Sequence, residues 1–340
     1  MWIELLITVI KIGLVINVLL VSVAYAVYAE RRVSAFMQNR YGPNRVGYQG
    51  LLQSFADVIK LVFKEDIVPT KANKPIHTLA PMISIFVALT TIAVVPFGHQ
   101  IELFGRIITL QITDVNVGVL YILALTSLGV YGITLSGWSS NSKYSLFGGI
   151  RSSAQMISYE LSMGLSVVGI VLITGSLSLQ EIVLHQYGWM WNIVLQPLGF
   201  IIFLVASFAE TNRTPFDLPE AEPELVGGYH TEYSSMKFAL FFLAEYANMI
   251  IASTVIATLY LGGWQVPYLQ AMELPPMVTA VIQVLAFCAK VAFLVFFFIW
   301  VRWSLPRFRY DQLMNLGWKV MLPLSILNII VTAIVVSLLK

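Results

Sequence analysis

Charged residues and cysteine are both scarce in this sequence. Charged side chains make up 11% of the 340 residues and hydrophobic ones 58%, whereas soluble domains carry about 25% charged residues. A water-soluble core has no use for so much apolar surface, so the composition predicts an integral membrane protein. The net charge of +2 argues against a nucleic-acid partner, which calls for a strongly basic surface.

The single cysteine and several missing motifs exclude whole classes of chemistry. Cys288 alone can form neither an internal disulfide nor an iron–sulfur cluster held by thiolates of this chain. No G-x-G-x-x-G run, P-loop or Cys-x-x-Cys pair is present, so no nucleotide or redox motif is indicated. The histidines lie in predicted loops or at the edges of apolar runs, where they cannot hold a haem between facing helices. We therefore expect no metal ion and no cofactor bound by this chain, and any electron carriers in partner chains.

Eight apolar runs are long enough for transmembrane helices of about 20 residues. They lie near residues 5–28, 79–98, 115–138, 154–174, 191–209, 238–260, 277–303 and 320–339. Lipid offers the backbone no hydrogen-bond partners, so the spans must be helical. We predict an all-α polytopic membrane protein with eight transmembrane helices in a single membrane domain, 1–340. The first run is too long for a signal-peptide core and follows no basic cluster, so we expect it to remain a span.

The distribution of lysine and arginine predicts the orientation. Loops 29–78, 139–153, 210–237 and 302–319 share one side of the membrane and hold 16 of the 20 basic residues. Basic residues concentrate on the cytoplasmic side. We therefore expect these loops in the cytoplasm, both termini outside, and soluble partners to dock from the cytoplasm.

Residues 50–65, GLLQSFADVIKLVFKE, form a second kind of helix. Apolar residues recur there at three- and four-residue steps, with polar ones largely on the other side. The segment is too short to span, so we predict an amphipathic helix lying flat at the cytoplasmic interface. It either anchors the chain or frames a side opening for a lipid-soluble molecule. The basic stretch before it, including Arg31, Arg40 and Arg45, either anchors the chain at anionic headgroups or forms a shaped turn.

Carboxylates gather where the chain enters the membrane. The segment from Glu210 to Glu232 holds six of the 18 acidic residues and one base, Arg213. Within the spans, Glu160, Glu245 and Lys290 each cost about 2.5–3.5 kcal/mol on insertion scales. Such residues are either structural pairs or parts of a proton path, and the partner of Lys290 is not identifiable from sequence.

The depth of the two span carboxylates follows from where their helices begin. Ser152-Ser153 as the cap of the fourth span places Glu160 about 12 Å below the surface, and Glu245 lies equally far past Lys237. Equal depth makes a shared polar cavity possible, with Glu210 and the acidic loop above it. Gly227-Gly228, at the end of that loop, marks either a hinge or only a turn.

Several polar segments resemble one family closely. They are Glu30-Arg31-Arg32, QNRYGPNRVG (38–47), VFKED (62–66), GWSSNSKYSLFG (137–148), RSSAQMISYE (151–160), ETNRTPFDLPEAEPELVGGYHTEYSSMKF (210–238) and LPRFRYDQLMNLGWKVMLP (305–323). They resemble the bacterial H-type membrane subunits of the proton-pumping NADH–quinone oxidoreductases, respiratory complex I. The resemblance runs nearly end to end.

The resemblance implies a membrane subunit that forms the quinone chamber and its entrance. It places FMN, the iron–sulfur clusters and NADH in other subunits and implies quinone and lipid as further partners, in the bacterial inner membrane. The proton-coupling carboxylates it implies are Glu160, Glu210, Asp217, Glu220, Glu222, Glu224 and Glu245. The predicted quinone-channel residues are Arg31, Arg40, Arg45, Phe55, Ala56 and Asp57.

Three other functions remain open at this point. The same fold would serve the membrane subunit of an energy-converting hydrogenase, which uses no quinone. Carboxylates within the spans also suit a secondary cation transporter, or a scaffold in which they act only through assembly. The sequence does not distinguish ubiquinone from menaquinone, nor whether protons cross this chain.

Overall fold

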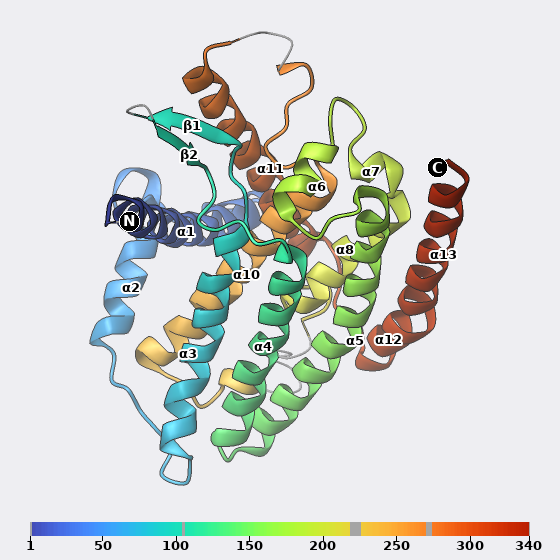
Figure 1. Cartoon of the computed structure of the whole chain (residues 1–340). Coiled ribbons are helices and arrows are strands. Elements are labelled where there is room, and N and C mark those ends of the chain that lie inside the picture. The colour runs from blue at the N-terminus through green and yellow to red at the C-terminus, as the bar shows by residue number, and fades with distance from the viewer. Residues whose placement is uncertain (1, 104–105, 218–225, 270–273, 340) are drawn as a thin grey trace.

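The computed structural model of the chain describes residues 2–103, 106–217, 226–269 and 274–339. Seven helices within these ranges are long and apolar enough to cross a membrane (Figure 1). They are α1 (Trp2–Met37), α3 (Lys74–Thr91), α4 (Gly118–Ser139), α5 (Lys143–Thr174), α10 (Ser235–Tyr260), α11 (Pro276–Ser304) and the stretch of α12 (Tyr310–Asn315), a π-helix (Leu316–Met321) and α13 (Leu322–Leu339). The prediction of an all-α polytopic membrane protein is confirmed.

The predicted span 191–209 is divided into two shorter helices. These are α7 (Asn192–Leu195) and α8 (Pro197–Glu210). The chain is non-helical at Gln196, and Pro197 opens α8, because proline lacks the backbone N–H that a helix interior requires but its first turn does not. At 14 residues α8 is about 21 Å long, which is less than the roughly 30 Å of a hydrocarbon core.

Two helices begin or end well away from the predicted limits. The first extends to Met37, so Glu30 and Arg31 lie on α1 and not in a loop. The fourth span begins at Lys143, after Ser142. The prediction that Ser152-Ser153 cap this span is therefore wrong, and with it the depth calculation for Glu160.

Short elements complete the chain. The interfacial segment contains a 3₁₀ turn (Tyr48–Gly50) and α2 (Gln53–Phe63), and a second 3₁₀ turn (Ile92–Val94) continues α3. A helix α6 (Leu179–His185) begins at Ser178, whose hydroxyl accepts a hydrogen bond from Glu181 N. A third 3₁₀ turn, η3 (Gly228–His230), precedes α10.

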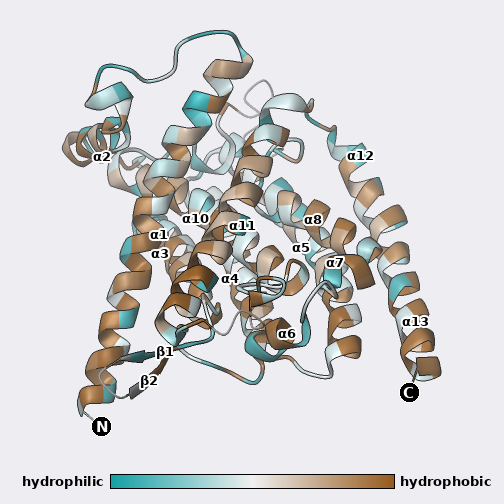
Figure 2. Cartoon of the chain, turned by 90° about the horizontal axis from the view of Figure 1, so that it is seen from above, coloured by the Kyte–Doolittle hydropathy of each residue, from teal (hydrophilic) through white to brown (hydrophobic). Residues whose placement is uncertain are grey.

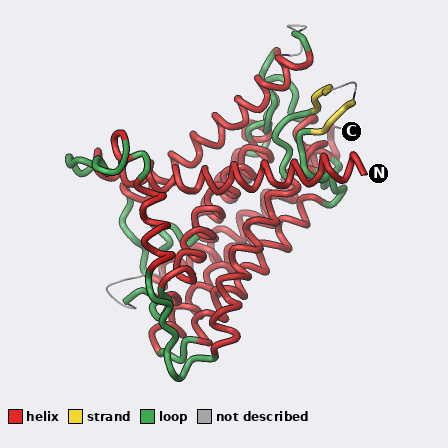
Figure 3. The backbone as a smooth tube through the Cα atoms, turned by 90° about the vertical axis from the view of Figure 1, so that its left-hand side faces the viewer, coloured by secondary structure: helices red, strands yellow, loops and turns green. Residues whose placement is uncertain are grey.

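A small antiparallel hairpin, which the sequence analysis did not predict, joins β1 (Gln100–Leu103) and β2 (Arg106–Thr109). Lys11 of α1 donates hydrogen bonds to Thr109 Oγ1 (3.3 Å) and Gln111 O (3.1 Å) beside it. The hairpin and both chain ends lie at the same end of the bundle (Figures 2 and 3). An even number of crossings produces this arrangement.

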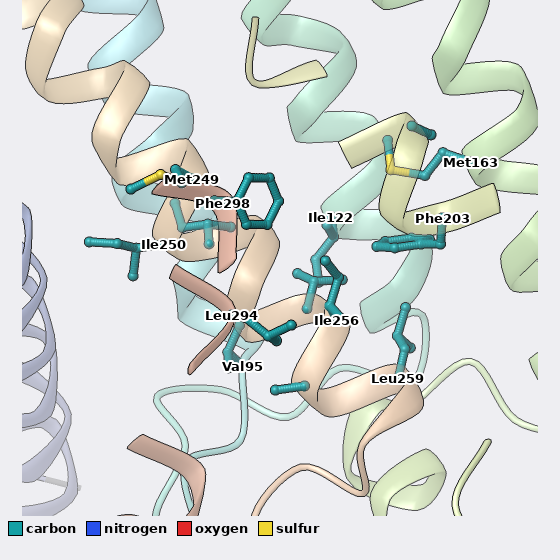
Figure 4. Close-up of a cluster of buried hydrophobic side chains, with 14 of the residues drawn as sticks. Val95, Ile122, Met163, Phe203, Met249, Ile250, Ile256, Leu259, Leu294 and Phe298 are labelled. Carbon is teal, nitrogen blue, oxygen red and sulfur yellow. The ribbon is translucent and has the colours of Figure 1, made fainter. Parts of the chain in front are cut away.

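The apolar core centres on α10. Met249, Ile256 and Leu259 of α10 are buried against side chains from α4, α5, α8 and α11 (Figure 4). The outer helices instead turn apolar residues outward, and hydrophobic ribbon dominates α1 and α13 in Figure 2. A lipid environment accounts for this distribution, since it favours apolar surface on the outside as well as within.

Polar side chains fasten α13 to the bundle. Its buried residues are Ser325, Asn328 and Thr332. Asn328 Nδ2 donates to Gln196 Oε1 (2.8 Å), and Gln196 Nε2 donates to Thr332 Oγ1 (2.7 Å). Helix contacts in lipid gain little from the hydrophobic effect, so hydrogen bonds and close packing hold them.

Candidate functional site

A cavity lies between α3, α4, α5, α8 and α10, with about 80 Å³ of space for the centres of water molecules. One water needs about 10–15 Å³ of such space, so several fit. Its polar wall includes Thr126, Glu210, Asn212, Glu245 and Asn248. Elsewhere the wall is largely apolar, with residues such as Val119, Val167, Leu179 and Leu259.

Glu160 and Glu210 form a close carboxylate pair beside this cavity. Glu210 ends α8, and its carboxyl group interacts electrostatically with Glu160 of α5. Glu160 also accepts a hydrogen bond from the Ser127 hydroxyl of α4. Two interacting carboxyl groups bind protons as a coupled unit. The structure thus brings together Glu160 and Glu210 at the cavity whose wall also contains Glu245.

A buried ion-pair network connects Glu245 to α1. Arg213 Nε lies 3.0 Å from Glu245 Oε1, and Arg213 Nη1 lies 3.3 Å from Glu30 Oε2. Glu30 also pairs with Arg302 of α11 (2.7 Å) and accepts a hydrogen bond from the Tyr246 hydroxyl (2.7 Å). The Arg213 guanidinium lies over the Tyr246 ring, 4.1 Å from its centroid. Five groups from four segments therefore share two formal anions and two formal cations out of water.

Sequence reasoning missed Glu30 and Arg302 as members of this network. Both lie at the cytoplasmic ends of apolar runs, where they look like headgroup anchors. The available signal was their charge within three residues of a long apolar run, since ionisable groups near hydrocarbon commonly pair with one another.

The described part of the acidic loop is anchored at both ends. Asp217 is 2% exposed, and its carboxylate lies 3.0 Å from Arg307 Nη2. At the other end, a Cβ added to Gly148 of α5 would lie 2.7 Å from Gly228 Cα. Gly228 has a positive φ of 61°, so this backbone contact indicates a fixed turn. The predicted residues Glu220, Glu222 and Glu224 lie outside the described residues.

The quinone-channel prediction is only partly drawn together. Arg31 Nη1 lies 2.5 Å from Asp57 Oδ2, which joins α1 to α2. Arg40 is exposed and donates to the Gln38 side chain, and Arg45 is exposed. Neither of these two arginines contacts the Arg31–Asp57 pair in the described chain.

The helix α2 turns its polar side inward. Ser54 donates to Ala24 O of α1 (2.7 Å), and Gln53 donates to Asp57. Phe55 on the apolar side is 44% exposed, while Ala56 is half-buried. An interfacial helix whose apolar side faces outward presents that side to lipid.

Lys290 has a definite partner, which the sequence did not reveal. Its Nζ donates to the carbonyl oxygens of Leu261 (2.7 Å), Gly263 (2.8 Å) and Gln265 (2.8 Å), just past the end of α10. It also lies 4.4 Å from the centroid of the Trp191 ring. A cation at a helix C-terminus complements the orphan carbonyls and the helix dipole.

The loop side of the bundle holds one further titratable pair. The His77 and Tyr233 rings stack with 3.9 Å between centroids, and the Tyr233 hydroxyl lies 3.3 Å from Ser139 Oγ. Burial raises the pKa of Tyr233 to about 12, so its hydroxyl stays protonated at neutral pH. Within the described residues, no group of three or more His, Cys, Asp or Glu side chains is arranged to hold a metal ion.

The fold and these contacts define a multi-pass membrane protein that keeps carboxylates and arginines inside a helical bundle, around a cavity with one polar wall. The model of the NADH dehydrogenase family matches residues 10–333. The chain therefore belongs to this family.

Individual relatives agree with the family assignment, and those compared are membrane subunits of bacterial NADH-quinone oxidoreductases. The first of two H-type subunits of Cytophaga hutchinsonii is 55% identical over 318 residues, which cover 94% of this chain and 93% of that protein. The second H-type subunit of Koribacter versatilis is 55% identical over 349 residues, 98% of either chain. Subunit 8 of the Rhodothermus marinus enzyme is 55% identical over 335 residues, 96% of either chain. These names favour the NADH–quinone oxidoreductase interpretation over the hydrogenase and transporter alternatives.

Proposed function

We propose that this chain forms the quinone chamber and its entrance within an NADH–quinone oxidoreductase and couples quinone reduction to proton translocation. It is the H-type membrane subunit of such an enzyme and is not catalytic alone. With one cysteine it cannot hold a thiolate-bound cluster, so electrons reach the quinone from partner subunits that carry FMN and iron–sulfur clusters.

The observation that carries this proposal is the placement of three carboxylates. Glu210 and Glu245 line one water-sized cavity, and Glu160 interacts with Glu210. Carboxylates in contact with each other and with confined water exchange protons more readily than isolated, fully paired ones. We regard Glu160, Glu210 and Glu245 as the proton-coupling residues of the described chain, with Asp217 positioning the loop through Arg307.

The entrance lies at the Arg31–Asp57 pair and α2. The ion pair holds α2 against α1, and the apolar side of α2 faces outward. An apolar quinone tail in the bilayer meets this side first. Arg31, Asp57, Phe55 and Ala56 frame the route, while the exposed Arg40 and Arg45 supply positive charge beside it.

The mechanism is electrostatic. Reduction of a quinone by two electrons requires two protons, and negative charge builds up until they arrive. That charge raises the affinity of nearby groups for protons and cations. The carboxylates around the cavity respond by changing their shared protonation, which alters their repulsion and the position of the acidic loop. We place the large loops in the cytoplasm and both termini outside, in the bacterial inner membrane.

Replacement of Glu210 by glutamine tests this function in the complete complex in membrane vesicles. The side chain keeps its shape but can no longer bind and release a proton. We expect the complex to assemble and its proton-coupled quinone reductase activity to fall at least about tenfold, the scale of a lost acid–base group. Asp311→Asn is the matched control, because Asp311 pairs with Arg309 on the surface. Full activity and full pumping in Glu210→Gln would refute the proposal.

A further inference from the structure

One arginine stands between the two halves of the proposed mechanism. Arg213 is 2% exposed and contacts carboxylates from two different helices, Glu30 of α1 and Glu245 of α10. Its guanidinium group also lies on the Tyr246 ring. A planar, five-donor guanidinium can serve two acceptors in different directions, which a lysine ammonium does less well.

The two carboxylates belong to different surroundings. Glu30 precedes Arg31, whose partner is Asp57 on α2, so Glu30 lies on the side of the proposed entrance. Glu245 lines the cavity that contains Glu210. Arg213 is not part of the cavity wall, although its neighbours Thr211 and Asn212 are. The side chain of Arg213 thus lies behind the cavity wall, between the two surroundings.

An arginine in this place conducts charge effects but not protons. Guanidinium stays protonated in proteins and accepts no hydrogen bond, so it cannot take a proton from one carboxyl group and give it to another. It does respond to the charge of each. When Glu245 becomes neutral, the attraction of Arg213 concentrates on Glu30, and the reverse follows when Glu30 is neutralised or engaged elsewhere.

We propose that Arg213 is a positioning residue that links the charge of Glu30 to the charge of Glu245 while preventing proton transfer between them. This inference rests on the proposed function. Linkage of this kind is reciprocal in free energy, so a charge change at the entrance alters the proton affinity of Glu245 as much as the reverse. Arg302 and the Tyr246 hydroxyl hold Glu30 in place while Arg213 shifts.

Arg213→Lys in the complete complex tests the inference. Lysine keeps the charge but presents it as a single point, and a buried lysine gives up its proton far more readily than arginine. In membrane vesicles we expect the number of protons moved per NADH oxidised to fall by about half or more, while quinone reductase turnover falls less. The matched control is Arg302→Lys, which changes another buried arginine on Glu30 but not one on Glu245. It should lower turnover and pumping together and keep their ratio.

Either of two results would overturn the inference. One is an unchanged ratio of protons to NADH in Arg213→Lys, and the other is an equal fall of this ratio in both lysine variants. If Arg213→Lys does not assemble, Glu30→Gln gives the same test, because it removes one of the two linked charges and should also lower the ratio. Loss of pumping in Glu210→Gln together with normal coupling in Arg213→Lys would reject only the role of Arg213. Normal pumping in Glu210→Gln would reject the proposed function itself.

Discussion

Lys290 illustrates how this chain accommodates a charge inside an apolar helix. Three carbonyl oxygens accept its three protons, and the Trp191 ring covers it. The acceptors follow α10 in a turn where Gly262 and Gly263 both have positive φ angles of 72° and 51°. Glycine adopts such angles without steric cost, so this turn presents its carbonyls to one point. The ammonium thus joins α11 to the end of α10.

Lys290→Met should destabilise the complex. The side chain retains its length, but three buried carbonyls lose a charged donor, and each orphaned acceptor costs about 1–3 kcal/mol. We expect a lower temperature for thermal dissociation of the purified complex. Lys319→Met, which replaces an exposed lysine, should leave this temperature unchanged, and an equal change in both variants would contradict the role of the carbonyl contacts.

The partner of Lys290 illustrates what a sequence withholds at this scale. Insertion cost shows that a buried lysine needs acceptors, but not which ones. Its acceptors are backbone oxygens of a turn, and no side-chain pattern marks them. The pairing of Glu30 with Arg213, 183 positions later, is equally invisible. By contrast, Glu160, Glu210 and Glu245 stand out because carboxylates in apolar runs are rare.

At the scale of single elements, α2 is the helix most directly tied to substrate entry. Its polar side faces α1, while the larger apolar residues Leu52, Phe55 and Ile59 are exposed. The Arg31–Asp57 pair fixes its position along α1. This element therefore offers a surface to the bilayer from a fixed place, as an entrance requires.

Ala56→Trp should raise the apparent KM for quinone with a smaller effect on kcat. Ala56 is half-buried, and an indole there narrows the space beside α2. Quinone titrations of NADH oxidation in membranes provide the measurement. Phe63→Trp is the control, since Phe63 is 85% exposed at the end of the helix. A loss of stability in Ala56→Trp with an unchanged KM would identify α2 as an anchor.

Helix limits show where periodicity is sufficient and where it is not. The amphipathic pattern of residues 50–65 corresponds to α2, because its apolar spacing has no competing signal. The start of α5 was misplaced because Ser152 and Ser153 look like a cap, yet both lie inside the helix, where Ser153 donates to Gly149 O (2.7 Å). The break before α8 was marked by Pro197, but hydropathy alone runs through it.

At the scale of the whole molecule, hydropathy and composition are sufficient to predict the fold class. The tertiary arrangement is not predictable in the same way, because every helix is apolar and packing partners are chosen by a few polar contacts. Gln196, Asn328 and Thr332 lie far apart in sequence and meet only in the fold. Cooperation between segments this distant leaves no local trace.

The orientation of the molecule can be tested by labelling. In a Cys288→Ala background, Lys71→Cys places a thiol in the loop before α3, and Tyr187→Cys places one in the connection after α6. Both native residues are exposed. We expect a membrane-impermeant maleimide to reach position 71 only from the cytoplasmic side and position 187 only from the opposite side, because basic loops stay inside. The reverse pattern would show that the orientation is inverted.

The shortness of α8 has an electrical consequence. Because the helix covers only about two-thirds of the apolar thickness, the chain at residues 211–217 is irregular and mostly buried within the bundle. Irregular backbone at such depth survives only inside protein. Charges there lie within the voltage drop of an energised membrane, where crossing the whole drop involves about 2.3 kcal/mol per elementary charge per 100 mV. Any displacement of Arg213 along the membrane normal therefore performs work with or against the potential that the enzyme itself generates.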